Sequence, residues 1–168
     1  IEETYESIGD EDVAVDTTAP IITIIGDNPI TLERGTSYIE VGASADGGET
    51  VITSGTVNTS TVGTYKITYS ASDGFNTGTA TRTVNVVDTA DPVITVTGDN
   101  PVTVELGATY TDAGAVAVDF GQSIDVSSSS TLDTSSVGSY KVTYSATDSS
   151  GNTSTVTRTI NVVDTTKP

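Results

Sequence analysis

Apolar and polar residues alternate along one stretch of the chain, and this stretch occurs twice. The first copy, GTYKITYSASD, covers residues 63–73, and the second, GSYKVTYSATD, covers residues 138–148. In the first copy the apolar positions are Tyr65, Ile67, Tyr69 and Ala71, separated by Lys66, Thr68 and Ser70. A period of two, with one apolar and one polar face, is typical of a half-buried strand. Each copy is therefore predicted to form a long strand that packs on one side.

The same alternation predicts shorter strands around this one. In the first copy of the pattern we expect strands near residues 21–25, 30–33, 37–45, 50–55, 63–72 and 79–87, with 56–61 as an open alternative. Thr and Val fill many of these positions, and β-branched side chains suit a sheet surface. No window has sustained helical spacing. Six or seven short antiparallel strands separated by turn residues predict a small β-sandwich in each copy.

Internal repetition predicts the domain organisation. Pro20, Gly26 and Gly35 recur as Pro92, Gly98 and Gly107, and a short Asp-Thr-x-x-Pro joint begins at residues 16, 88 and 164. We therefore expect one module over residues 16–87 and a second over 88–168, with 164–168 as a joint to a following module. Residues 1–15 are predicted to be an acidic tail or the remnant last strand of a preceding module.

One tyrosine in each copy stands at a distinctive place. Gly63-Thr64-Tyr65 resembles the tyrosine corner of immunoglobulin-like domains, where a Tyr near the start of the penultimate strand hydrogen-bonds back to the backbone. Tyr140 has the same place in the second copy. The alternative is that both tyrosines are core residues only, which is compatible with the same fold.

Several longer segments resemble a known family. The segments DTTAP, ITIIGDNPITLERG, VGTYKITYSASD and TATRTVNVVD are similar to the bacterial Ig-like repeats found in tandem in secreted and cell-surface proteins. Related modules occur beside hyalin-type repeats and in some pesticidal crystal proteins. The resemblance covers residues 16–168 and implies an all-β chain of two tandem immunoglobulin-like antiparallel β-sandwiches, located outside the cell. It leaves the function open, because one fold serves many functions.

Charge and hydropathy exclude two classes of partner. The chain has 23 acidic and six basic residues, a net charge of −17, and the basic residues are scattered (Arg34, Lys66, Arg82, Lys141, Arg158 and Lys167). Without a basic patch, nucleic-acid binding is not expected. No apolar run approaches the roughly 20 residues of a membrane helix. The chain starts at Ile1 without a signal peptide, so we expect a processed product or an excerpt.

Catalytic chemistry is not expected either. The chain has no His and no Cys, so the usual pairs of nucleophile and base cannot be assembled. Carboxylate pairs such as Asp46 and Glu49 stand in predicted loops with no aromatic cleft, whereas glycosidase sites normally pair their carboxylates within a shaped groove. The sequence therefore predicts neither catalytic residues nor an organic cofactor.

The acidic residues of the joints are the one constellation that predicts a binding site. At the joint between the copies, the loops of an Ig-like sandwich would gather Asp27, Asp88, Asp91, Asp119 and Asp148. The equivalent set at the first joint is Asp16, Asp46, Glu49 and Asp73. Oxygen-rich clusters of this kind suit Ca²⁺. The alternative is that Asp serves turns and solubility in these loops.

Taken together, the sequence predicts a non-catalytic structural module of an extracellular bacterial array, a stalk, spacer or fibre building block whose partners are neighbouring Ig-like modules. One alternative is an adhesin segment that binds a glycan or another surface through Phe75 and Phe120, both in predicted loops. Another is a filament subunit that exchanges a strand through residues 12–15. Two sequons, at Asn58 and Asn152, are candidate glycosylation sites.

Overall fold

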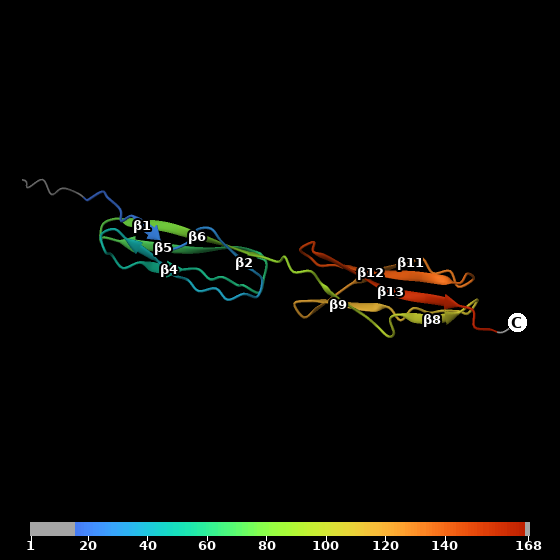
Figure 1. The fold of residues 1–168 in the computed structure, drawn as a ribbon. Helices are drawn as coiled ribbons and strands as arrows, with labels where there is room; N and C mark the ends of the chain where they lie inside the picture. Colours follow the sequence, from blue (N-terminus) through green and yellow to red (C-terminus); the bar gives the residue numbers. More distant parts are fainter. Residues whose placement is uncertain (1–15, 167–168) are drawn as a thin grey trace, which may run out of the picture. The chain divides into compact units, whose positions relative to one another are not determined.

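The computed structural model describes residues 16–166, and every regular element in that range is a β-strand (Figure 1). The chain divides into two compact units, with the border between Val87 and Asp88. The first is called unit 1 here and the second unit 2. Each unit contains two sheets, so the all-β class and the paired sheets expected from the sequence are confirmed.

Unit 1 combines a small and a larger sheet. Its strands within the described residues are β1 (Ile22–Ile24), β2 (Ile30–Glu33), β3 (Ala43–Ala45), β4 (Ile52–Ser54), β5 (Gly63–Ser72) and β6 (Thr77–Val87). The small sheet pairs β1 with β3, and the larger has the order β2-β6-β5-β4. The hairpin of β5 and β6 is the longest pairing, in register from Gly63 opposite Val86 to Ser72 opposite Thr77. This hairpin contains the alternating stretch from which the fold was predicted.

Unit 2 repeats this plan with one more strand. Its strands are β7 (Val93–Val96), β8 (Val102–Glu105), β9 (Ala115–Asp119), β10 (Gln122–Ile124), β11 (Val126–Ser130), β12 (Gly138–Thr147) and β13 (Thr153–Val163). One sheet has the order β10-β9-β7 and the other β11-β12-β13-β8. The additional strand β10 forms a hairpin with β9, with Gln122 opposite Asp119.

One strand pair in each unit is parallel, within sandwiches whose other strand pairs are antiparallel as expected. β2 runs parallel to β6, with Ile30 opposite Val84, and β8 runs parallel to β13. The reason is the turn at residues 26–29, which moves the chain from the small sheet to the larger one without reversing its direction. The next segment therefore lies alongside the last strand and runs the same way.

Two predicted strands are also shorter than expected or absent. Of the segment 37–45 only Ala43–Ala45 is a strand, because Glu40 turns inward and its carboxylate accepts a hydrogen bond from the Gly42 amide. Residues 56–61 form no strand. There the Asn58 side chain accepts a hydrogen bond from the Ser60 amide, which makes a turn. In both places, polar side chains take hydrogen-bonding positions that a strand ladder would use.

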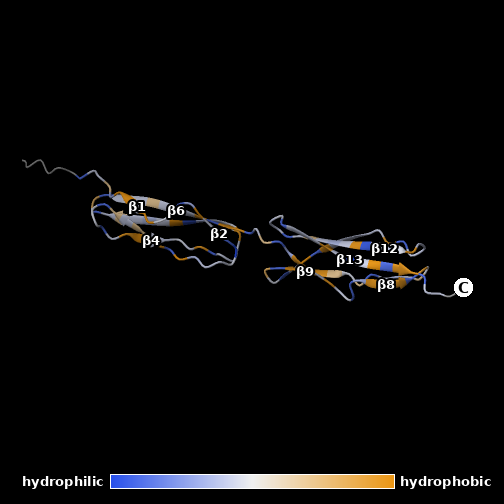
Figure 2. Ribbon diagram, viewed as in Figure 1, coloured by the Kyte–Doolittle hydropathy of each residue, from blue (hydrophilic) through white to orange (hydrophobic). Residues whose placement is uncertain are grey.

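The inward faces are those that the alternation predicts. Ile67, Tyr69 and Ala71 of β5 are buried, whereas Thr68 and Ser70 between them are only half-buried and the preceding Lys66 is exposed. In unit 2 the core groups Val104, Val142, Tyr144 and Ile160. Hydrophobic and hydrophilic residues alternate in colour along β13 (Figure 2). The period of two read from the sequence therefore assigns the buried side of each long strand correctly.

The two tyrosine corners are confirmed. The Tyr65 hydroxyl donates to the Thr61 carbonyl over 2.8 Å, and the Tyr140 hydroxyl donates to the Ser136 carbonyl over 2.9 Å. Each bond fixes the segment before a central strand to that strand's own side chain.

Removal of the Tyr65 hydroxyl is expected to weaken unit 1 modestly. The Tyr65→Phe variant loses one hydrogen bond and keeps the ring, so the free energy of unfolding should fall by about 1 kcal/mol. Denaturant unfolding of the whole chain measures this, and Tyr140→Phe provides the matched change in unit 2. A Tyr65→Phe variant as stable as the parent would contradict a stabilising corner bond.

Candidate functional site

Each unit buries one arginine in its last strand. Arg82 of β6 is 0% exposed and Arg158 of β13 is 1% exposed. Charged side chains are almost never fully buried unless they are paired, since removing an ion from water is costly. Both arginines are therefore expected to have charged or polar partners inside their unit.

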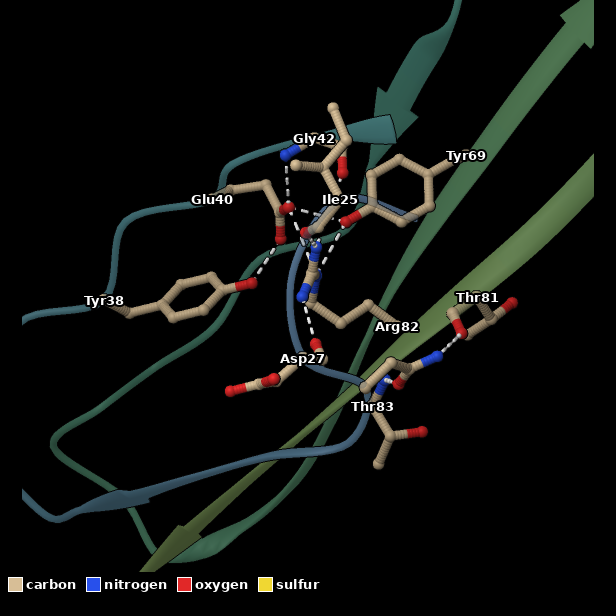
Figure 3. Close-up of polar contacts among 10 residues, drawn as sticks. Ile25, Asp27, Tyr38, Glu40, Gly42, Tyr69, Thr81, Arg82 and Thr83 are labelled. Carbon is tan, nitrogen blue, oxygen red and sulfur yellow. Dashed lines mark hydrogen bonds and ion pairs between the residues drawn. The ribbon is translucent and has the colours of Figure 1, made fainter. Parts of the chain in front are cut away.

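The Arg82 guanidinium reaches both sheets of unit 1 (Figure 3). Its Nε donates to the Tyr69 hydroxyl at 2.9 Å and lies 3.3 Å from Glu40 Oε1. Its other nitrogens donate to backbone carbonyls of the chain around the small sheet, namely those of Ile25 at 2.5 Å, Gly42 at 3.4 Å, and Asp27. A side chain of the larger sheet thus binds three carbonyls of the segments that flank the strands of the small sheet.

Glu40 completes this group. Its carboxylate accepts hydrogen bonds from the Tyr38 hydroxyl, from the Tyr69 hydroxyl at 2.6 Å and from the Gly42 amide at 2.7 Å. Burial alone would raise the pKa of Glu40, but these bonds and the Arg82 charge together hold the pKa below its ordinary value. Burial and the neighbouring carboxylate raise the pKa of both tyrosines. Glu40 is therefore the ionised partner of Arg82.

Unit 2 builds the same group with a shorter acid. Arg158 lies 2.9 Å from Asp112 Oδ1, donates to the Tyr110 hydroxyl at 2.8 Å and also binds the carbonyls of Thr97 and Gly114. Asp112 lacks one methylene of Glu40, and the Arg158 Nε is left buried without a partner among the described residues. Arg158 therefore links the last strand of unit 2 to segments that flank the other sheet, which indicates a role in joining the two sheets.

Sequence reasoning missed this network. It treated the arginines only as scattered charges, because nothing local marks a residue as buried. A signal was present, however: Tyr38-x-Glu40-x-Gly42 recurs as Tyr110-x-Asp112-x-Gly114. The repeat of an acid and a tyrosine at this spacing could have indicated a shared partner.

Acidification is expected to destabilise both units through these carboxyls. Their ordinary pKa values are 4.5 for Glu40 and 3.8 for Asp112, and the folded state lowers both. The folded state therefore binds fewer protons, so the stabilisation is present above those values and is lost as the pH falls through the lower folded pKa. We expect the denaturant concentration at the unfolding midpoint, measured from about pH 6 to about pH 2, to decrease once the pH is below about 4–5. Midpoints that stay constant over this range would contradict the assignment.

A second group gathers acidic residues at the start of unit 2. Asp88, Asp119 and Asp148 each offer a carboxylate oxygen, and these oxygens all lie within 4.8 Å of one another. Asp88 opens the unit, Asp119 ends β9 and Asp148 follows β12. All three are buried. Three of the five residues predicted for this joint therefore meet in one place.

Asp148 is held in its ionised form. Its carboxylate accepts hydrogen bonds from the Ser150 amide at 2.8 Å and from the amide and side chain of Asn152 at 2.9 and 2.8 Å. Burial would raise the pKa of Asp148, but these bonds keep it below the ordinary value. The Asn152 side chain also donates to the Asp88 carbonyl at 3.1 Å, so the second sequon lies inside this cluster.

The other two predicted residues, Asp91 and Asp27, are not members of this group. Asp91 lines a cavity of about 250 Å³ in unit 2 that Asp119 also lines, together with Val93, Val118 and Phe120. Asp27 belongs to unit 1, between β1 and β2, where its carbonyl accepts a hydrogen bond from Arg82. Neither is part of the group of three within unit 2.

Unit 1 has an acidic group at the corresponding place. All four residues predicted for the first joint line one cavity of about 290 Å³, namely Asp16, Asp46, Glu49 and Asp73. The backbone amides of Asn76 and Phe75 donate to Asp73 and lower its pKa. Asp46 accepts from the Ile21 amide at 2.9 Å, which fixes it beside the entering chain.

Glu49 takes the place that Asp119 has in unit 2. Ala45 pairs with Ile22 as Ala117 pairs with Ile94, so Gly47 corresponds to Asp119. A Cβ built on Gly47 would lie 2.2 Å from Glu49 Oε1, which means that the Glu49 carboxylate fills the space of the missing side chain. Both units thus place a carboxylate there, from different residues. Glu49 Oε2 is buried and has no hydrogen-bond partner among the described residues.

Comparison with known proteins places this fold in context. The model of the family described as "Bacterial surface protein, Ig-like domain" matches residues 22–86 and again residues 94–162. Hyalin of Strongylocentrotus purpuratus is 32% identical over 175 aligned residues, which cover 92% of the chain and 15% of hyalin. Hyalin of Lytechinus variegatus is 37% identical and covers 93% of the chain and 33% of its own length. The chain therefore spans a third or less of these relatives.

Two solved structures are similar to part of this chain. A lipoprotein of Bacteroides thetaiotaomicron matches with a TM-score of 0.41 and 28% identity over 46% of the chain and 40% of its own. The M60 catalytic domain with two CBM51 domains of Clostridium perfringens ZmpB matches with a TM-score of 0.45 and 17% identity over 86% of the chain and 31% of its own. Within the described residues, no helix is long and apolar enough to cross a membrane.

Proposed function

Because the chain belongs to the family of bacterial surface protein Ig-like domains, we propose that it is a non-catalytic structural part of an extracellular array, where it acts as a stalk or spacer. Its partners are neighbouring Ig-like modules of the same array. The group around Arg82 supports this proposal, since its polar atoms bind one another and the backbone and so stabilise the fold.

The observation that carries the proposal is the position of the two ends of each unit. In unit 1 the Pro20 carbonyl lies against Gly78, near the start of β6, and the chain leaves at Val87, where β6 ends. In unit 2 the Asp88 carbonyl binds Asn152, just before β13, and that strand ends at Val163. Each unit is therefore entered at one end of its last strand and left at the other. This geometry lets modules follow one another in series.

Imaging of the native assembly on the bacterial surface tests the stalk. We expect separate globular beads in line, each the size of one Ig-like module. An ordered fibre would favour the building-block alternative, and a compact particle without a linear array of beads would contradict both. Strand exchange through residues 12–15 falls outside the described residues. Phe75, at 81% exposed, remains the clearest test residue for glycan binding, and a glycan array with Phe75→Ser checks that alternative.

Calcium binding at the two acidic groups is the second part of the proposal. Carboxylate and carbonyl oxygens are the ligands that Ca²⁺ prefers. Unit 1 has Gly47 where unit 2 has Asp119, yet the Glu49 carboxylate fills that space, so both units place a negative charge in the same part of the acidic group. A bound cation would relieve the repulsion among the three carboxylates of unit 2.

Calcium is therefore expected to raise the thermal stability of the chain relative to chelator. At a concentration of 100 times the dissociation constant, binding stabilises the folded state by about 2.7 kcal/mol. Differential scanning calorimetry measures the shift. Asp148→Asn should abolish it for unit 2, whereas Asp27→Asn, outside both groups, should leave it intact. Equal melting temperatures in calcium and in chelator would count against the site.

A further inference from the structure

The chain that enters unit 1 and the strand by which it leaves lie side by side and run in the same direction. β2 pairs in parallel with the end of β6, from Ile30 opposite Val84 to Glu33 opposite Val87. The entering segment before β2 also contacts β6, because β1 packs against this strand and the Pro20 carbonyl lies against Gly78 near its start. Tension between the two ends therefore pulls these neighbours along their length in opposite directions, as a shear. In shear all the bonds between them are stretched together, whereas peeling would break them one at a time.

Side chains add bonds along this line. The Asn28 side-chain Nδ2 donates to the Thr81 backbone carbonyl at 3.0 Å, and the Asn28 side-chain Oδ1 accepts from the Thr83 backbone amide at 2.9 Å. Asn28 thus bonds to β6 as a neighbouring strand would, just ahead of the β2 ladder. Asn100 repeats both bonds in unit 2, with Thr157 and Thr159 at 2.9 Å each.

Arg82 lies between the two Asn28 contacts on β6 and binds the same entering segment from inside the unit. Its guanidinium donates to the carbonyls of Ile25 and Asp27, on either side of the turn at Gly26. Glu40 and Tyr69 fix its orientation. Movement of β6 against the entering chain must break these charge-assisted bonds together and deprive the buried guanidinium of two of its acceptors, which is unfavourable.

We propose that Arg82 and Arg158 are tension-bearing crosslinks, each of which locks the last strand of its unit to the entering chain. The chain contains no Cys, so no disulfide can supply this connection. A lysine cannot replace the arginine, because it lacks the planar fork of donors that reaches several carbonyls at once. The benefit of such a crosslink to the organism rests on the stalk function proposed above.

Single-molecule pulling of the whole chain by its two ends tests this role, with Arg82→Lys changed in unit 1 and unit 2 left as the internal reference. We expect unit 1 to rupture roughly tenfold faster or more at constant force. The bonds that Arg82→Lys removes are made in the folded unit and broken at the transition state for rupture, so their loss lowers the barrier. Arg158→Lys should move the effect to unit 2.

Tyr65→Phe is the matched control, because it removes a hydrogen bond of unit 1 that does not join β6 to the entering chain. For each variant the increase in rupture rate is divided by the loss in the free energy of unfolding. This ratio must be larger for Arg82→Lys than for Tyr65→Phe. Equal effects would overturn the proposal and leave Arg82 as an ordinary stabilising residue. If Arg82→Lys fails to fold, Asn28→Ala removes exposed bonds of the same shear line and must also speed rupture more than the control.

Pulling on the purified chain is independent of imaging the native assembly. A unit that resists tension through Arg82 in an array that is not a stalk would overturn the proposed function alone. Beads on a stalk whose rupture ignores Arg82 would overturn the crosslink alone.

Discussion

Replacing Glu40 by alanine is expected to lower the free energy of unfolding of unit 1 by about 3–5 kcal/mol, the usual cost of removing one partner of a buried ion pair. Arg82 is 0% exposed and its side chain lies 3.3 Å from Glu40 Oε1. The variant would leave the guanidinium buried without its carboxylate and would also remove the acceptor of the Tyr69 hydroxyl. This loss is a large part of the stability of a small domain.

Denaturant unfolding of the whole chain measures the Glu40→Ala effect, and the transition of unit 2 serves as an internal reference. Asp27→Asn is the matched control. It removes one negative charge from the turn whose carbonyl binds Arg82, but its own side chain is exposed, so the change should stay within about 0.5 kcal/mol. A Glu40→Ala loss no larger than that of Asp27→Asn would show that Arg82 does not depend on this carboxylate.

Adding a single methyl group at Gly78 is expected to be the second largest change. Gly78 is buried in β6, and a Cβ there would lie 1.8 Å from the Pro20 carbonyl oxygen and 2.9 Å from its carbon. Both atoms belong to the backbone, so the entering chain must move away from β6. We expect Gly78→Ala to cost about 3 kcal/mol, the upper part of the range for overpacking.

The same variant should also disturb the acidic cavity of unit 1, because Asp16 and Pro20 both line it. The calcium-dependent part of the stability of unit 1 should therefore shrink together with the denaturant midpoint. Ser154→Ala is the control, since Ser154 is the second residue of β13 as Gly78 is of β6, and unit 2 already accepts a Cβ there. A Gly78→Ala variant with unchanged stability would mean that the entering chain does not pack on β6.

Local pattern explains why much of the fold was accessible from the sequence. The alternation through Ile67 and Tyr69 predicts which face of β5 is buried, and the recurrence of Tyr65 as Tyr140 predicts the tyrosine corner of each unit. The positions of several joint carboxylates could also be read from the sequence, because Asp73 and Asp148 follow the recognisable strand copies and Asp16 and Asp88 begin the joints. These positions are fixed by neighbours along the chain.

The parallel pairing of β2 with β6 and the irregular path through Glu40 were not accessible in this way. Both depend on residues far apart in the sequence, since Arg82 draws Glu40 inward and binds the chain at Ile25. A charge pattern does not tell a buried arginine from a solvated one. Nor does it show that Glu49 reaches back over Gly47.

The sequence by itself therefore determined the repeated modules, their long strands, the inward faces of those strands and the carboxylates near each joint, because all of these depend on short-range spacing and on comparison of the two copies. Only the tertiary structure decided which of those carboxylates meet and what holds the two sheets of each unit together. Those outcomes depend on contacts that form when the chain folds back on itself, where a buried charge must find its partners or the fold loses stability.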